Sequence, residues 1–207
     1  DAPLARQITW KGEEILTDLA TAILNSVAST TLAINLSVSS DIKVLNESFF
    51  KQEVGEEKND YTVNYKGAAG LQEVRSVQKS FYSDAFLSAG AASPDDGLSR
   101  QITWKAAAID VAGLAVYALT TIGELAITDN NENGKKVLSE SFLEGEPGEE
   151  KNDYTVNYKG AANDQSVRNV QVSFYGTTAT GLRATNSSVS PDDPLARQIT
   201  WKGEEIL

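Results

Sequence analysis

The residues with the clearest chemical potential form a run of oxygen-bearing side chains from Asp129 to Gly134, followed by Glu140. The run fits the pattern D-x-[DN]-x-[DN]-G-x5-E of calcium-binding loops. Calcium takes about six to eight oxygen ligands, and a glycine lets the chain turn tightly around the ion. The pattern predicts a calcium site whose ligands would be Asp129, Asn131, Asn133 and Glu140.

A polar hairpin turn is the competing interpretation of the same residues. Lys136 stands where helical calcium loops carry an aliphatic residue, and the flanking residues alternate as in strands. Asn133-Gly134 is also a strong signal for a tight turn between two strands. The first half of the chain shares only Glu47 with this pattern, as the counterpart of Glu140. We therefore expect no cofactor, with calcium as the alternative.

Catalytic chemistry is limited by the residue types that the chain lacks. It contains no cysteine, no methionine and no histidine. This excludes a thiol nucleophile, a Ser-His-Asp triad and zinc ligation by cysteine or histidine. Paired carboxylates could serve glycoside hydrolysis, but no spacing places two of them in one cleft. The sequence therefore predicts that the protein is not an enzyme.

Two long internal repeats set the organisation of the chain. Residues 3–16 return letter for letter as 194–207, and residues 55–69 return as 148–162. The chain is thus two copies of one module of roughly 95 residues plus the start of a third copy. Turn-like Ser-Pro-Asp-Asp sequences mark the joints. We predict repeat module 1 at 1–96, repeat module 2 at 97–193 and the start of a third repeat at 194–207.

Alternation of apolar and polar residues predicts that most of each module is strand. Strands are expected at 7–10, 31–38, 42–50, 61–65 and 77–81, and in the second copy at 101–104, 124–128, 135–143, 154–158 and 170–174. Residues 13–27 place their apolar side chains on one side of a helix, with a weaker counterpart at 106–119. The expected fold is mainly β, built from β-sandwich-like or α+β modules in tandem, each with about five strands and one short helix.

The segment repeated at both ends has an alternating Gln-Ile-Thr-Trp sequence at its centre. Alternation places Ile8 with Trp10, and Ile199 with Trp201, on one face of a strand. The last copy would complete the sheet of module 2, exchange with its twin in a neighbouring molecule, or reflect an arbitrary boundary. Exchange would make Ile8, Trp10, Ile199 and Trp201 the assembly contacts. Head-to-tail exchange does not close on itself, so it builds filaments.

Charge and composition restrict the partners. The formal net charge of −11 at pH 7 argues against nucleic acid and against an anionic membrane surface. No apolar run reaches the length of a membrane span. A chain without thiols suits an oxidising exterior, so we expect an extracellular or cell-surface location. Aromatic residues at alternating strand positions, and the variable loops after Tyr82 and Tyr175, leave a carbohydrate or other cell-surface ligand open as a partner.

These observations together favour a structural protein. We expect a tandem-repeat module of an extracellular array or filament, such as a surface layer, a pilus-like fibre or an adhesin stalk, whose main partner is itself. An adhesin or lectin-like binding module is the first alternative, and a phage tail or capsid-decoration protein is the second.

Overall fold

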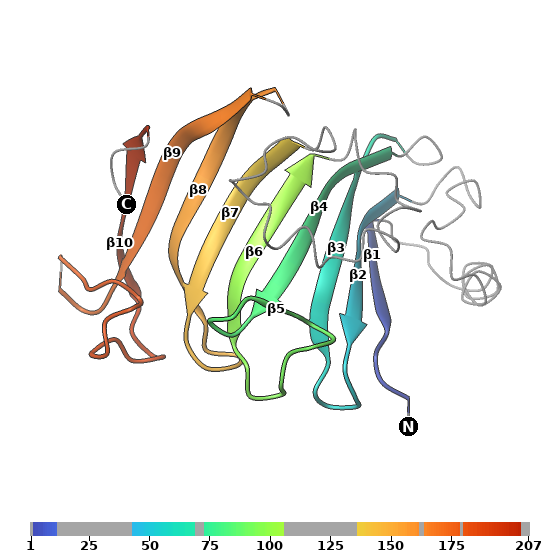
Figure 1. Cartoon of the computed structure of the whole chain (residues 1–207), viewed down its shortest axis with the longest axis horizontal. Helices are drawn as coiled ribbons and strands as arrows, with labels where there is room; N and C mark the ends of the chain where they lie inside the picture. Colours follow the sequence, from blue (N-terminus) through green and yellow to red (C-terminus); the bar gives the residue numbers. More distant parts are fainter. Residues whose placement is uncertain are drawn as a thin grey trace.

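The structure, a computed structural model, describes residues 2–11, 43–68, 73–105, 136–161, 164–178 and 180–203. Their strands form one antiparallel sheet in which neighbours along the chain are also neighbours in space (Figure 1). The strands are β1 (Arg6–Lys11), β2 (Lys43–Lys51), β3 (Lys58–Lys66), β4 (Glu73–Tyr82), β5 (Leu87–Ser88), β6 (Leu98–Lys105), β7 (Lys136–Glu144), β8 (Lys151–Ala161), β9 (Asp164–Tyr175) and β10 (Leu195–Lys202). The short β5 pairs with β4 beside the main path.

The prediction of a mainly β chain is confirmed, but the described strands form a single layer and not a sandwich. The strands β1 to β4 and β6 to β9 correspond to the two sequence repeats, and β10 begins the third. Strand β4 pairs with β6, so the sheet continues across the predicted boundary at residue 96. The predicted helices at 13–27 and 106–119 lie outside the described residues, as do the predicted strands at 31–38 and 124–128.

The two faces of the sheet differ sharply in chemistry. One face carries the buried core, in which valine, tyrosine and other strand-favouring side chains recur at alternate positions. The core consists of Val44, Tyr61, Val63, Tyr65, Val77, Phe81, Ile102, Trp104, Val137, Val156, Tyr158, Val170 and Val172. The other face carries serine, threonine, asparagine and glutamine at the intervening positions, as the strand registers show. We call it the polar face.

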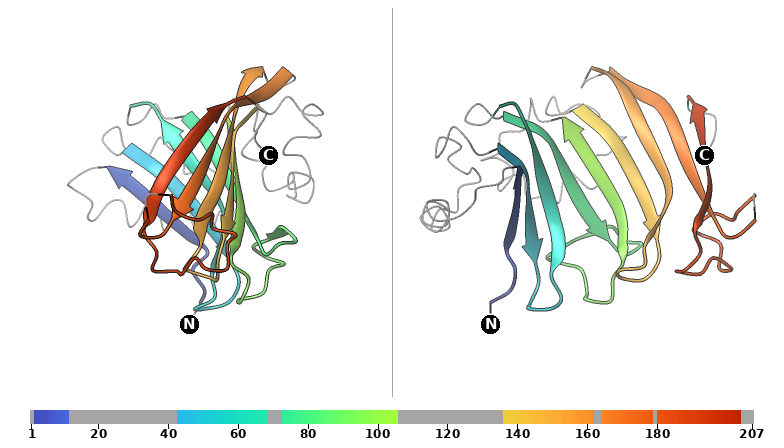
Figure 2. Two further views of the ribbon diagram at one scale, coloured as in Figure 1. Left: turned by 90° about the vertical axis from the view of Figure 1, so that its left-hand side faces the viewer. Right: turned by 180° about the vertical axis from the view of Figure 1, so that it is seen from behind.

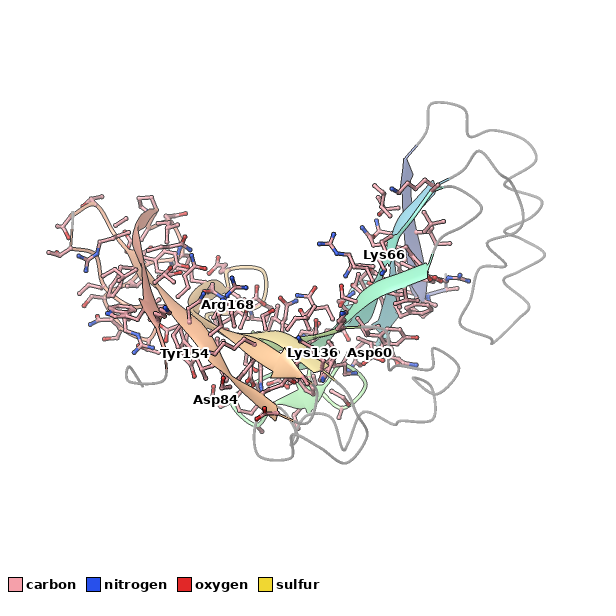
Figure 3. The ribbon with its side chains drawn as sticks, turned by 90° about the horizontal axis from the view of Figure 1, so that it is seen from above. Asp60, Lys66, Asp84, Lys136, Tyr154 and Arg168 are labelled. Carbon is pink, nitrogen blue, oxygen red and sulfur yellow. The ribbon has the colours of Figure 1, made fainter. Side chains whose placement is uncertain are left out.

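The sheet is bent into an open arc, visible from the side and from above (Figures 2 and 3). Lys66 and Arg168 project to the inside of the arc, whereas Asp60 and Tyr154 lie on its outside (Figure 3). Tyr154 packs against the core. The polar face is therefore concave and the core face is convex.

The joints between repeats are held by lysines. The Lys58 ammonium donates to the carbonyl oxygens of Pro94 at 3.0 Å and Asp96 at 2.7 Å. The Lys151 ammonium donates in the same way to Pro191 at 2.6 Å and Asp193 at 2.8 Å. These contacts tie each joint to the third strand of its own repeat, which gives a fixed connection in place of a free linker.

Candidate functional site

Strand β6 shows what the repeated terminal segment does in the interior of the sheet. It pairs with β4 on one side, where Ile102 lies opposite Lys79, and with β7 on the other, where Ile102 lies opposite Glu140. Ile102 is fully buried as a result. The environment of β6 is therefore the reference for β1 and β10, which share its sequence pattern.

The β7 side of β6 is fixed by a buried charge cluster. Arg100 forms an ion pair with Glu140, whose side chain has no exposed surface. The Tyr158 hydroxyl donates to the other carboxylate oxygen of Glu140 at 3.1 Å. Burial raises the pKa of Glu140, and Arg100 opposes that rise. The Leu98 nitrogen also donates to the Glu150 carboxylate at 2.9 Å. These contacts set the register of β6 on the β7–β8 hairpin.

Strand β1 reproduces this half of the β6 environment. Arg6 forms an ion pair with the buried Glu47, and the Tyr65 hydroxyl donates to Glu47 at 2.9 Å. The Leu4 nitrogen donates to the Glu57 carboxylate at 3.0 Å, and this bond is the main cause of the lowered pKa of Glu57. The β1–β2 register also matches, because Ile8 lies opposite Glu47. The β1 edge facing away from β2 is unpaired among the described strands.

Strand β10 makes with β9 the contacts that β6 makes with β4. The Gln171 amide donates to the Gln198 oxygen at 3.2 Å, and Gln198 donates to the Ser173 hydroxyl at 3.3 Å. The equivalent bonds of β6 measure 3.1 Å and 3.3 Å and join Gln101 to Gln78 and Ser80. Ile199 lies opposite Val172, as Ile102 lies opposite Lys79.

On the other side of β10, the described residues form no counterpart of the charge cluster. Within the described part of the chain, Arg197 pairs with no carboxylate, and no carboxylate accepts a hydrogen bond from Leu195. The Arg197 guanidinium instead lies 4.8 Å from the centre of the Phe174 ring. A single strand that made the β1 contacts on one side and the β10 contacts on the other would have the complete environment of β6. Sequence reasoning missed the arginines and considered Glu140, with its counterpart Glu47, only as a calcium ligand, although a charged residue recurring at an apolar strand position was a usable signal for the ion pairs.

The four predicted assembly residues lie on the end strands. Ile8 and Trp201 pack against the core, and Ile199 is half-buried. Trp10 pairs through its backbone with Val44. Of the predicted calcium ligands, Glu140 is bound to Arg100 and Tyr158, whereas Asp129, Asn131 and Asn133 lie outside the described residues. Across the described ranges, no three acidic side chains gather as a metal site would need.

The concave polar face is a second candidate. Its side chains hydrogen-bond across neighbouring strands, as in Ser48 with Thr62 and Ser141 with Thr155, both at 2.9 Å. Strand alternation places lysines at one end of this face: Lys43, Lys66, Lys105, Lys136, Lys159 and Lys202. Lys105 lies directly opposite Lys136, an arrangement that repels. Glu73 lies opposite Lys66 at this end, and the excess of lysines beside neutral hydroxyl and amide groups can bind anions.

The tyrosines among the strand aromatic residues, which left a carbohydrate ligand open, serve the core. Tyr61, Tyr65 and Tyr158 are each 9% exposed, and the Tyr82 and Tyr175 hydroxyls donate to the carbonyl oxygens of Asn59 and Asn152, both at 2.8 Å. Their rings are therefore not presented to a ligand.

Comparisons with known proteins give no family for this chain. No family profile matches it, and no curated protein has a significantly similar sequence. No helix in the described segments is long and apolar enough to cross a membrane.

Proposed function

We propose that this chain is a structural tandem-repeat protein whose repeats join head to tail into one continuous sheet. Extracellular arrays or filaments, such as a surface layer, a pilus-like fibre or an adhesin stalk, are the assemblies that it suits. The supporting observation is that β1 carries one half of the β6 environment and β10 carries the other half. One strand of this type, placed between β9 of one molecule and β2 of the next, would rebuild an interior junction.

Apolar burial would favour the junction. Ile102 in β6 is fully buried, whereas Ile8 and Ile199 at the ends of the sheet are only partly buried. Fully burying such a side chain contributes about 1.5–3 kcal/mol. An exposed sheet edge has unpaired backbone groups that can pair with another chain. Completing the strand pairing at the junction satisfies these groups.

Disulfide trapping tests the junction, because residues 1–207 contain no cysteine. Thr200 lies opposite Gln171 in the β9–β10 pair, so Thr9 of an incoming β1 would lie opposite Gln171. The variant Thr9→Cys with Gln171→Cys should give a ladder of disulfide-linked multimers on non-reducing gels. Within one molecule β1 and β9 lie roughly 30 Å apart at the usual strand spacing, so an internal disulfide is excluded.

A matched control is available in the first repeat. Gln78 is the twin of Gln171, but its strand edge is covered by β6, where it faces Thr103. Thr9→Cys with Gln78→Cys should therefore stay monomeric. The variant Asn46→Cys with Thr200→Cys reports the other route, in which β10 of one molecule lies on β2 of another. Absence of a ladder from both junction variants would refute the proposed function.

A binding module of the adhesin or lectin type is the second candidate, and the concave polar face favours it. The ligand that this face suits is an anionic polysaccharide, since hydroxyl and amide groups bind sugar hydroxyls and the lysine row binds acidic groups. Binding to a polyuronate should weaken with salt and with Lys105→Glu plus Lys136→Glu. Equal binding to a neutral glucan, or no binding at all, would exclude this candidate.

A further inference from the structure

The edges at which two molecules would join are both occupied within the single chain. Strand β1 covers β2, and β10 covers β9. A junction between β9 of one molecule and β2 of the next needs one such strand, but the two molecules bring two copies. One copy has to leave before an interior junction can form. This inference rests on the proposed function and concerns how that assembly is controlled.

Keeping both copies in the junction would break the pairing pattern of the sheet. All strand pairs of the sheet are antiparallel, and β1 and β10 are the first and ninth strands of its path. They therefore run in the same direction, and placing them side by side would make a parallel pair. The β6 environment has no such pair, so displacement fits the observed sheet better than simple edge addition.

The contacts of the two copies indicate which one leaves. Releasing β1 would remove Arg6 from Glu47, whose side chain is 1% exposed, and a buried charge without its partner is costly. Releasing β10 breaks no ion pair within the described residues. Arg197 and Leu195 are exposed, and Leu195 is 51% exposed. The strand that is easier to release is therefore β10.

We propose that β10 is a releasable cap on the β9 edge, and that β1 of a second copy of this chain takes its place. The incoming β1 keeps its Arg6–Glu47 pair and its own β2. It gains from β9 the contacts that β10 had made, with Gln7 replacing Gln198 and Ile8 replacing Ile199. The capped chain is consequently a monomer that assembles slowly, and the duplicated strand regulates assembly.

Removing the cap should therefore promote assembly. The chain shortened by residues 194–207 should form multimers at concentrations where the whole chain remains monomeric, as measured by size-exclusion chromatography with light scattering. With Thr9→Cys and Gln171→Cys present, cross-linking should be at least about tenfold faster without the cap. That ratio corresponds to a release penalty of about 1.4 kcal/mol or more.

Two further measurements keep the test decisive if the shortened chain folds poorly. The whole chain with Ile199→Asp and Trp201→Asp should also assemble faster, because both side chains belong to the core side of β10. A synthetic peptide of residues 194–207, added in excess to the shortened chain, should cap β9 and return it to monomers. The same peptide with both aspartates should have no effect.

The outcomes separate this inference from the proposed function. Cross-linking at equal rates with and without β10 would overturn the cap and leave head-to-tail joining intact. Cross-linking of Asn46→Cys with Thr200→Cys alone would show that β1 is the strand released, which also overturns the cap. No cross-linking in any variant would overturn both proposals.

Discussion

The two repeats each bury an aspartate at the equivalent position, but they pair it with different cations. In the first repeat Asp60 pairs with Lys79 of the neighbouring strand β4. In the second repeat the counterpart of Lys79 is Val172, and the buried Asp153 pairs instead with Arg183 from the loop after β9. The cation of the ion pair thus comes from a strand in the first repeat and from a loop in the second, whereas the aspartate occupies equivalent positions in both.

The protonation behaviour of the two cations differs accordingly. The Lys79 side chain is 1% exposed, and burial lowers its pKa in spite of Asp60. The Arg183 side chain is 43% exposed, and its hydrogen bonds to Asp153 raise its pKa. What the fold requires is a cation beside the buried carboxylate, and a loop can supply it as well as a strand.

The largest effect should come from replacing Lys79 with valine, the residue type at the equivalent position of the second repeat, without adding a counterpart of Arg183. Lys79→Val leaves Asp60 buried and unpaired, which should lower the free energy of unfolding by about 3–5 kcal/mol. Urea denaturation followed by tryptophan fluorescence measures this. Adding Asp60→Asn should recover much of the loss, because the isolated charge is then gone. A loss below about 1 kcal/mol would show that Asp60 does not need Lys79.

Removing the loop cation should cost less. Arg183→Ala exposes the neighbourhood of Asp153 to water, so we expect a loss of about 1–2 kcal/mol, below that of Lys79→Val. Val172→Lys in the same variant should restore stability by recreating the arrangement of the first repeat. If Arg183→Ala is as damaging as Lys79→Val, the difference in exposure between the two sites has no energetic consequence.

The effect that is absent at neutral pH concerns buried tyrosines, a feature that the two repeats share. Burial raises the pKa of Tyr65, Tyr158 and Tyr82, that of Tyr82 to about 12. Above about pH 10 the unfolded chain therefore releases tyrosine protons that the folded chain retains. The contribution of these tyrosines to stability should be constant below that pH and fall above it by up to about 1.4 kcal/mol per pH unit for each of them.

Denaturation at a series of alkaline pH values measures this slope. Tyr65→Phe and Tyr158→Phe should each reduce it, and by similar amounts, since the two residues occupy equivalent positions and donate to the equivalent Glu47 and Glu140. A slope that both variants leave unchanged would show that other groups cause the alkaline loss of stability.

Alternation along the chain located most of the described strands, since β1, β2, β3, β4, β6, β7, β8 and β9 overlap predicted segments, whereas the short β5 was not predicted. It was not enough to show how they associate. A slip of one residue in register exchanges the two faces of a strand, and register depends on contacts between strands. For this reason the sequence did not indicate that the sheet continues across residue 96, because the pairing of β4 with β6 depends on contacts that neither strand shows alone.

The sequence by itself determined the duplication, the mainly β class and the lack of cysteine and histidine chemistry, because these follow from residue identity and local period. Only the tertiary structure decided that Arg100 meets Glu140, that Arg183 replaces Lys79, and that the two end strands each carry one half of an interior strand's environment. These facts depend on which strands lie side by side. That arrangement is set by packing between residues distant in sequence, where local propensity carries no information.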